Sequence, residues 1–144
     1  MKNAAFSNDD YRALAAFRAA LRRFQRFSET AARETGLTPQ QHQLLLAARG
    51  HDGPEPPTIT DLAEALQIKH NSAVELIDRV AHRGLVERQT SQQDNRRVFV
   101  IVTPAGEQLL RSLTSAHRSE IRELEAVLSQ LTARFEADAK RGSD

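Results

Sequence analysis

The 144-residue sequence contains no cysteine, and no apolar run in it approaches the ~20 residues that cross a bilayer. The lack of cysteine excludes disulfides, thiolate metal ligands and thiol-based redox sensing. The N-terminal residues also lack the charged-then-apolar layout of a signal peptide. We therefore expect a cytoplasmic protein built as one domain.

Common enzyme motifs are missing as well. There is no glycine-rich phosphate loop, no His-Glu-x-x-His sequence and no cysteine nucleophile. The five histidines are scattered, and one pair at helical spacing, His117 with Glu120, does not make a metal site. The sequence predicts a protein that is not an enzyme and needs neither a metal nor another cofactor.

Positive charge is present, but it is local. The formal net charge is only +1, yet two segments are rich in arginine, namely 11–33, with Glu29 as its one acid, and 79–97. Such a distribution fits a protein that binds nucleic acid with part of its surface. Solvated faces of ordinary helices explain it equally well, so charge alone leaves both interpretations open.

The flanks of the chain predict long helices. The first helix is expected from Ser7–Asp9 to about Glu34, with a narrow apolar stripe from Leu14 to Phe24. A second is expected from the Thr38-Pro39 cap to Gly50, followed by a stiff proline-rich loop over 51–57. The last is expected from Thr103-Pro104 to about Phe135, with a kink or break within 112–119.

The segment 60–103 organises the rest of the chain. We expect Thr60 to cap a short helix over 61–66 and Asn71 or Ser72 to cap a second helix that ends at Gly84, with Val74, Ile77, Val80 and Ala81 inward. Two strands follow at 85–89 and 98–102, with 58–60 as a short extended piece beside them. This order predicts a mainly α fold with a small β-hairpin, a winged helix-turn-helix domain flanked by long helices.

A helix of this kind fits the major groove of B-DNA and reads base edges near its N-terminal end. The side chains expected there are Lys69, His70, Asn71, Ser72, Glu75 and Arg79. For Asn71 and Ser72, plain helix capping is the alternative role.

The loop of the hairpin carries the second set of candidate DNA contacts, Asp94, Arg96 and Arg97. Arginine is favoured in a narrow minor groove. We expect Asp94 to fix the Arg96 guanidinium through a bidentate pair. The alternative is a surface turn with solvated charges.

Four motifs resemble the MarR family of bacterial transcriptional regulators. They are Asp61-Leu-Ala-Glu-Ala-Leu66, Val74–Arg79, Arg83-Gly-Leu-Val-Glu-Arg88, and Asp94-Asn-Arg-Arg97 with Val102-Thr-Pro-Ala-Gly106. Two positions depart from the family pattern: Val102 replaces a leucine, and Glu75 is acidic where relatives often carry a neutral or basic residue.

The resemblance implies a homodimer on a pseudo-palindromic double-stranded DNA operator. It divides the single domain into dimerisation helices at 1–35 and 105–144 and a DNA-binding winged helix at 36–104. It also implies a repressor that a small ligand, often aromatic and anionic, releases from DNA. Ligand candidates are Tyr11, Arg18, Arg22, His42 and His117.

A different class of function remains open. A winged helix can also serve as a protein-interaction module without DNA specificity. The polar surface from Lys69 to Glu75 and the presence of Arg96 favour DNA, because an apolar outer surface would be expected for protein contact.

Overall fold

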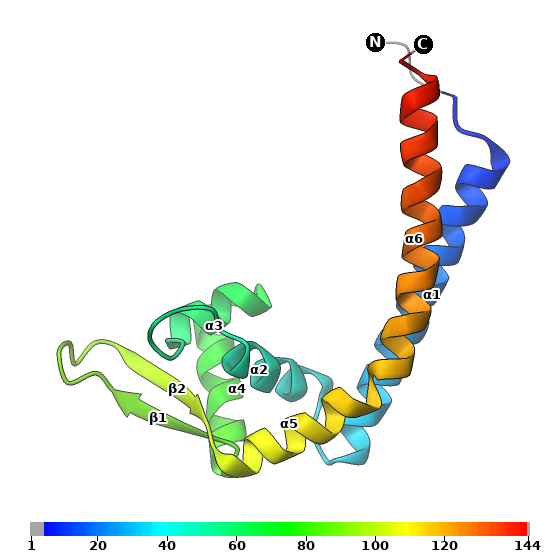
Figure 1. Cartoon of the computed structure of the whole chain (residues 1–144). Coiled ribbons are helices and arrows are strands. Elements are labelled where there is room, and N and C mark those ends of the chain that lie inside the picture. The colour runs from blue at the N-terminus through cyan, green and yellow to red at the C-terminus, as the bar shows by residue number, and fades with distance from the viewer. Residues whose placement is uncertain (1–4, 144) are drawn as a thin grey trace. The chain divides into compact units, whose positions relative to one another are not determined.

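The computed structural model describes residues 5–143, and these are mainly helical with one two-stranded antiparallel hairpin (Figure 1). This confirms the predicted fold class. The elements are α1 (Asn8–Glu34), α2 (Pro39–Arg49), α3 (Ile59–Leu66), α4 (His70–His82), β1 (Val86–Thr90), β2 (Val98–Val102), α5 (Pro104–Ala116) and α6 (Arg118–Arg141). They form two compact units, one over 31–115 and one from the described residues of 5–30 and 116–143.

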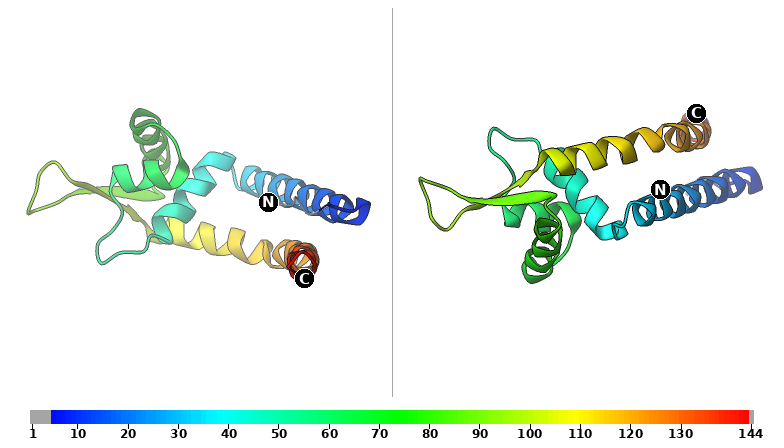
Figure 2. Two further views of the ribbon diagram at one scale, coloured as in Figure 1. Left: turned by 90° about the horizontal axis from the view of Figure 1, so that it is seen from above. Right: turned by 90° about the horizontal axis from the view of Figure 1, so that it is seen from below.

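The unit over 31–115 is a winged helix built on one apolar core. Its fully buried large side chains come from α2, α3, α4 and both strands, namely Leu44, Leu45, Leu62, Ile77, Val80, Val86 and Val100. The strands pair antiparallel from Val86 opposite Val102 to Thr90 opposite Val98. Both views in Figure 2 show the loop end of the hairpin projecting away from the helices of this unit.

The other edge of β2 is also occupied. The amide of Val100 donates to the carbonyl of Pro57 (2.8 Å), and Thr58 forms an isolated bridge with Phe99. The proline-rich loop therefore ends as a short third segment of the sheet. The expected extended piece is limited to Thr58, because Ile59 and Thr60 already belong to α3.

The start of α3 corrects the predicted Thr60 cap. Thr58 is the N-cap: its hydroxyl accepts from the amide of Asp61 (3.1 Å), and the Asp61 carboxylate accepts from the amide of Thr58 (2.9 Å). A cap at Thr60 would place Ala63 at the third helical position, where no side chain can return the bond. The same reciprocal arrangement between Thr38 and Gln41 starts α2, as predicted.

The start of α4 corrects a second expectation. Neither Asn71 nor Ser72 is a cap, because Lys69 occupies the N-cap position and no side chain caps the helix. The turn before it is short: Gln67 is left-handed (φ 55°), and the amide of Ile68 bonds back to Ala63 (3.0 Å). The chain therefore re-enters helix earlier than the sequence suggests.

The inward surface of α4 also differs from the expected stripe. Its buried residues are Ala73, Leu76, Ile77 and Val80, whereas Val74 and Ala81 are only partly buried. The helix is thus turned so that Ala73 and Leu76 face the core. This orientation follows from a helix that begins at His70 and packs against α2, α3 and β1.

Glycine is required at two positions in this unit, at Gly84 for its backbone conformation and at Gly106 for a close approach. Gly84 ends α4 in a left-handed conformation (φ 74°), as expected for a residue just past a helix. At Gly106, an added Cβ would lie 2.2 Å from the carbonyl oxygen of Leu85. The start of α5 therefore packs directly on the chain between α4 and β1, and Thr103, which caps α5, also donates to the carbonyl of Gly84 (2.6 Å).

The second unit pairs the first part of α1 with α6. Asp10 is buried and accepts from the amide (2.8 Å) and hydroxyl of Ser7 and from Arg134 of α6 (3.1 Å). Its pKa falls to about 2, first because of the Ser7 amide and then the other donors, against the effect of burial. The predicted break in the last helix lies at His117, between α5 and α6.

Several large apolar side chains of this unit face outward. Those exposed by 41 to 61% are Leu14, Leu128, Ile121, Phe6 and Tyr11. Among residues 5–143, no helix is long and apolar enough to span a membrane.

The capping box of α3 generates a prediction about pH. The pKa of Asp61 lies below its ordinary value of 3.8, mainly because the Thr58 amide donates to the carboxylate. A lowered folded-state pKa means that the ionised carboxylate stabilises the fold above pH 3.8 and that this contribution is lost as the pH falls below it. Asp61→Ala should cost about 1 kcal/mol at pH 7, as a lost helix cap does.

Urea unfolding at pH 7, 5 and 3 measures this difference. The gap in unfolding free energy between the wild type and Asp61→Ala should be constant from pH 7 to 5 and should shrink at pH 3. Glu64→Ala, at an exposed position of the same helix, is the control. A gap of equal size at pH 3 would show that the charge of Asp61 contributes nothing.

Candidate nucleic-acid interface

The N-terminal end of α4 presents a polar surface. Lys69, His70, Asn71, Ser72 and Glu75 are all exposed, and Arg79 is exposed one turn further along the helix. Because no side chain caps α4, no side chain occupies the first amide groups of the helix. Those amides, together with the positive end of the helix dipole, suit a phosphate oxygen.

The opposite surface of α4 holds it in place. Ala73, Ile77 and Val80 are completely buried in the core. From β1, the Arg88 guanidinium pairs with Asp78 and donates to the carbonyl of Val74 (3.4 Å). The helix is thus attached both to the core and to the hairpin.

The loop of the hairpin is ordered by its own backbone. The amide of Ser91 donates to the carbonyl of Arg97 (2.9 Å), and the amide of Arg97 donates to the carbonyl of Asp94 (3.0 Å). The Asp94 carboxylate accepts from the amide of Arg96 (3.0 Å), as aspartate does in many turns. These bonds set the direction in which the Arg96 side chain leaves the loop.

The expected bidentate pair between Asp94 and Arg96 is not formed. One Asp94 oxygen lies 3.8 Å from Nε of Arg96 and is already bonded to the Arg96 amide. The Arg96 side chain is 96% exposed. Asp94 therefore shapes the turn, and the guanidinium extends into solvent.

Arg97 lies in a different environment from its neighbour. Its guanidinium pairs with Glu55 of the proline-rich loop (3.1 Å) and lies over the ring of Phe99, 5.4 Å from its centre. The two adjacent arginines, which the sequence presents as equivalent, thus make different contacts.

The five predicted ligand residues do not come from one unit. Tyr11, Arg18 and Arg22 are exposed along α1, and His117 is buried beside the rings of Phe24 and Phe27, all in the unit of 5–30 and 116–143. His42 is buried in α2, in the other unit.

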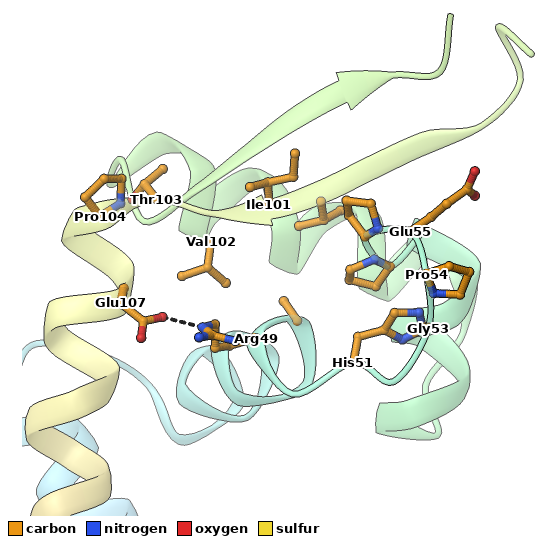
Figure 3. Close-up of a pocket in the computed structure, with 14 residues that line it drawn as sticks. Arg49, His51, Gly53, Pro54, Glu55, Ile101, Val102, Thr103, Pro104 and Glu107 are labelled. Atoms are coloured by element: carbon orange, nitrogen blue, oxygen red, sulfur yellow. Dashed lines mark hydrogen bonds and ion pairs between the residues drawn. The ribbon is translucent and has the colours of Figure 1, made fainter. Parts of the chain in front are cut away.

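A cleft of about 670 Å³ in the winged-helix unit was not anticipated from the sequence. It is lined by the end of α2, the proline-rich loop, β2 and the start of α5 (Figure 3). Its lining includes Arg49, Glu55, Glu107 and the imidazole of His51. Nε of Arg49 pairs with Glu107 at one end of the cleft (2.6 Å). None of the five predicted ligand residues lines it, because a loop without a recognisable motif forms one wall.

Metal ligands do not gather anywhere in the described part of the chain, which holds no group of three or more histidine, aspartate or glutamate residues placed to bind an ion.

An exposed polar helix end beside an ordered, arginine-bearing hairpin defines a winged helix-turn-helix protein. The MarR family model matches residues 35–97. A putative transcriptional regulatory protein for the hcr operon of Thauera aromatica is 28% identical over 120 residues, or 83% of this chain. The match covers 66% of that relative, so this chain spans about two thirds of its length.

Solved structures agree in fold. AbsC, a MarR family transcriptional regulator from Streptomyces coelicolor, matches with a TM-score of 0.69 at 21% identity, covering 94% of this chain and 93% of its own. MepR of S. aureus, in a complex with DNA, matches with a TM-score of 0.69 at 20% identity, covering 95% and 96%. A probable transcriptional regulator from Pseudomonas aeruginosa matches with a TM-score of 0.62 at 25% identity, covering 82% and 92%.

Residues 35–97 of the chain are therefore similar to the MarR family of transcriptional regulators. This confirms the resemblance found in its motifs. This match, which is to regulators, agrees with the expectation that the protein is not an enzyme.

Proposed function

We propose that the protein is a repressor that binds a specific double-stranded DNA sequence as a homodimer. The observation that carries this proposal is the geometry of the winged helix. The polar N-terminal end of α4 and the Arg96 side chain are both exposed, while the buried surfaces of α4 and of the hairpin hold them in place. MepR, which has the same fold, has been solved with DNA bound.

In this proposal α4 enters the major groove. Lys69, His70, Asn71 and Ser72 lie nearest the base edges, and Arg79 lies further along the groove wall. Asparagine suits adenine, lysine suits guanine or a phosphate, and an acidic side chain accepts from cytosine. Glu75 therefore biases the half-site toward a cytosine and against a phosphate contact at its position.

The wing supplies the minor-groove contact. Arg96 enters a narrow, A·T-rich groove, where the negative potential is strongest. Asp94 orders the turn from which Arg96 projects. Arg97 lies at the base of the same loop, where its guanidinium pairs with Glu55.

A second copy of the chain completes the binding protein. The dimerisation helices lie within 1–35 and 105–144, and the exposed apolar residues of α1 and α6 are the surface that the second copy covers. Two winged helices then contact successive major grooves of an inverted repeat.

A small, often aromatic and anionic effector would release the repressor. The predicted ligand residues Tyr11, Arg18, Arg22, His42 and His117 remain candidates, and the cleft beside Arg49 has the volume of a small-molecule site. Contact with chromosomal DNA would place the protein in the cytoplasm.

The alternative function is a protein-interaction module. It would require an apolar patch on the outer surface of α4, as in other helix-docking surfaces. The exposed residues of α4 are polar or charged, which favours DNA.

Selection of bound duplexes from a random DNA pool, at near-physiological salt, tests the function. An inverted repeat with half-site centres about one helical turn (~10 bp) apart is expected. On that operator, Arg96→Ala should lose about 1–3 kcal/mol of affinity. Arg12→Ala, which removes an exposed arginine of α1, is the control. Weak binding without a motif, falling steeply with salt, would contradict a specific regulator.

A second prediction concerns the dimer. Burying a leucine or isoleucine contributes about 1.5–3 kcal/mol. Leu128→Glu combined with Ile121→Glu should therefore raise the dimer dissociation constant by at least about tenfold. Analytical ultracentrifugation should find a monomer, whereas Ser129→Glu should stay dimeric. A double variant that dimerises normally would show that the second copy binds elsewhere.

A further inference from the structure

Arg97 is the one arginine of the wing loop whose guanidinium contacts another element of the winged-helix unit, as far as residues 5–143 are described. It pairs with Glu55 at 3.1 Å, and the two side chains are half exposed. Its guanidinium also covers the ring of Phe99, with 5.4 Å to the centre. The side chain of Arg96, the preceding residue, is 96% exposed, and its Nε lies 3.8 Å from a carboxylate oxygen of Asp94.

The segment that carries Glu55 is stiff and is attached to the same strand. Pro54, Pro56 and Pro57 restrict the backbone on both sides of Glu55. Pro57 accepts the amide of Val100 (2.8 Å), and Thr58 bridges to Phe99. The backbone of Glu55 is therefore held beside β2 by contacts that do not involve Arg97. Formation of the ion pair then costs little additional chain entropy.

From these contacts we propose that Arg97 is a positioning residue, which clamps the base of the wing to the proline-rich loop through Glu55 and leaves Arg96 as the arginine that enters the groove. The inference rests on the proposed DNA binding for its functional consequence. It separates the roles of two arginines that are adjacent in the sequence and chemically identical.

The clamp acts locally. A half-exposed ion pair contributes little to the stability of a whole domain, and a cation over an aromatic ring adds a similar small amount. The loop end of the hairpin projects away from the helices of the unit (Figure 2), so even a small stabilising contribution affects how often the loop leaves its position. Loss of the clamp should therefore loosen the wing without unfolding the unit.

Hydrogen exchange of the Val100 amide in the DNA-free protein measures the clamp directly. Arg97→Ala and Glu55→Ala should each speed this exchange by about two- to fivefold, and the double variant should be no faster than either. Arg96→Ala, the matched control, should leave it unchanged. Equal exchange in the wild type and both single variants would overturn the proposal, whether or not the protein binds DNA.

Operator affinity at near-physiological salt gives the second readout, with the same proteins and with Arg96→Ala combined with Glu55→Ala. Arg97→Ala should weaken binding by about two- to fivefold when Glu55 is present and should cost nothing when Glu55 is already alanine. Arg96→Ala should weaken operator binding by the same factor in the wild type and in the Glu55→Ala variant.

Three affinity results would contradict the clamp. The first is a loss of operator affinity from Arg97→Ala that is equal with and without Glu55, together with a salt dependence lowered by about one counterion. That result would identify a direct phosphate contact by Arg97. The second is tighter binding by Glu55→Ala that requires Arg97, since Glu55 would then mask a DNA contact. The third is a double variant weakened by the sum of both single losses. A wild type without any operator would instead contradict the proposed function and leave the exchange experiment as the test.

Discussion

The winged-helix unit depends on the burial of one surface of its hairpin. Val86 and Val100 are completely or almost completely buried, and they share a core with Ile77 and Val80 of α4. Each such side chain contributes on the order of 1.5–3 kcal/mol when it leaves water. Because the hairpin and α4 bury their apolar surfaces in the same core, their exposed residues are held in a fixed relation to each other.

Polar and close backbone contacts then fix the positions of individual elements around this core. Arg88 attaches β1 to α4, the Pro57–Val100 bond attaches the proline-rich loop to β2, and the packing of Gly106 against Leu85 fixes the start of α5. The end of α4 and the tip of the wing remain exposed. The proposed interface therefore combines backbone segments that the core holds in place with polar and charged side chains that extend toward a partner.

Much of this organisation was predictable from local sequence. The Thr38 cap, Gly36, Gly84 and the bounds of β2 follow from turn and cap chemistry that acts over a few residues. The predicted start of α3 was wrong by two residues and that of α4 by two or three. For α3, Thr58 and Thr60 are both suitable caps, and only the position of Asp61 decides between them.

Long-range contacts were not predictable from one sequence. Nothing local distinguishes Arg97 from Arg96, since the partner that separates them, Glu55, is about forty residues away in a loop without a motif. The cleft beside Arg49 was missed for the same reason. Asp94 was expected to bind the Arg96 side chain, but its carboxylate is used by the backbone of its own turn.

In the proposed complex, α4 reads the major groove while Arg96 reads the adjacent minor groove. Replacing A·T pairs of the operator by inosine·cytosine tests it, because inosine resembles guanine in the major groove but lacks the minor-groove amino group. At the wing positions, affinity should survive inosine·cytosine and fall with G·C. At the α4 positions, both replacements should weaken binding equally. Equal losses from the two replacements at the wing positions would contradict minor-groove contact by Arg96.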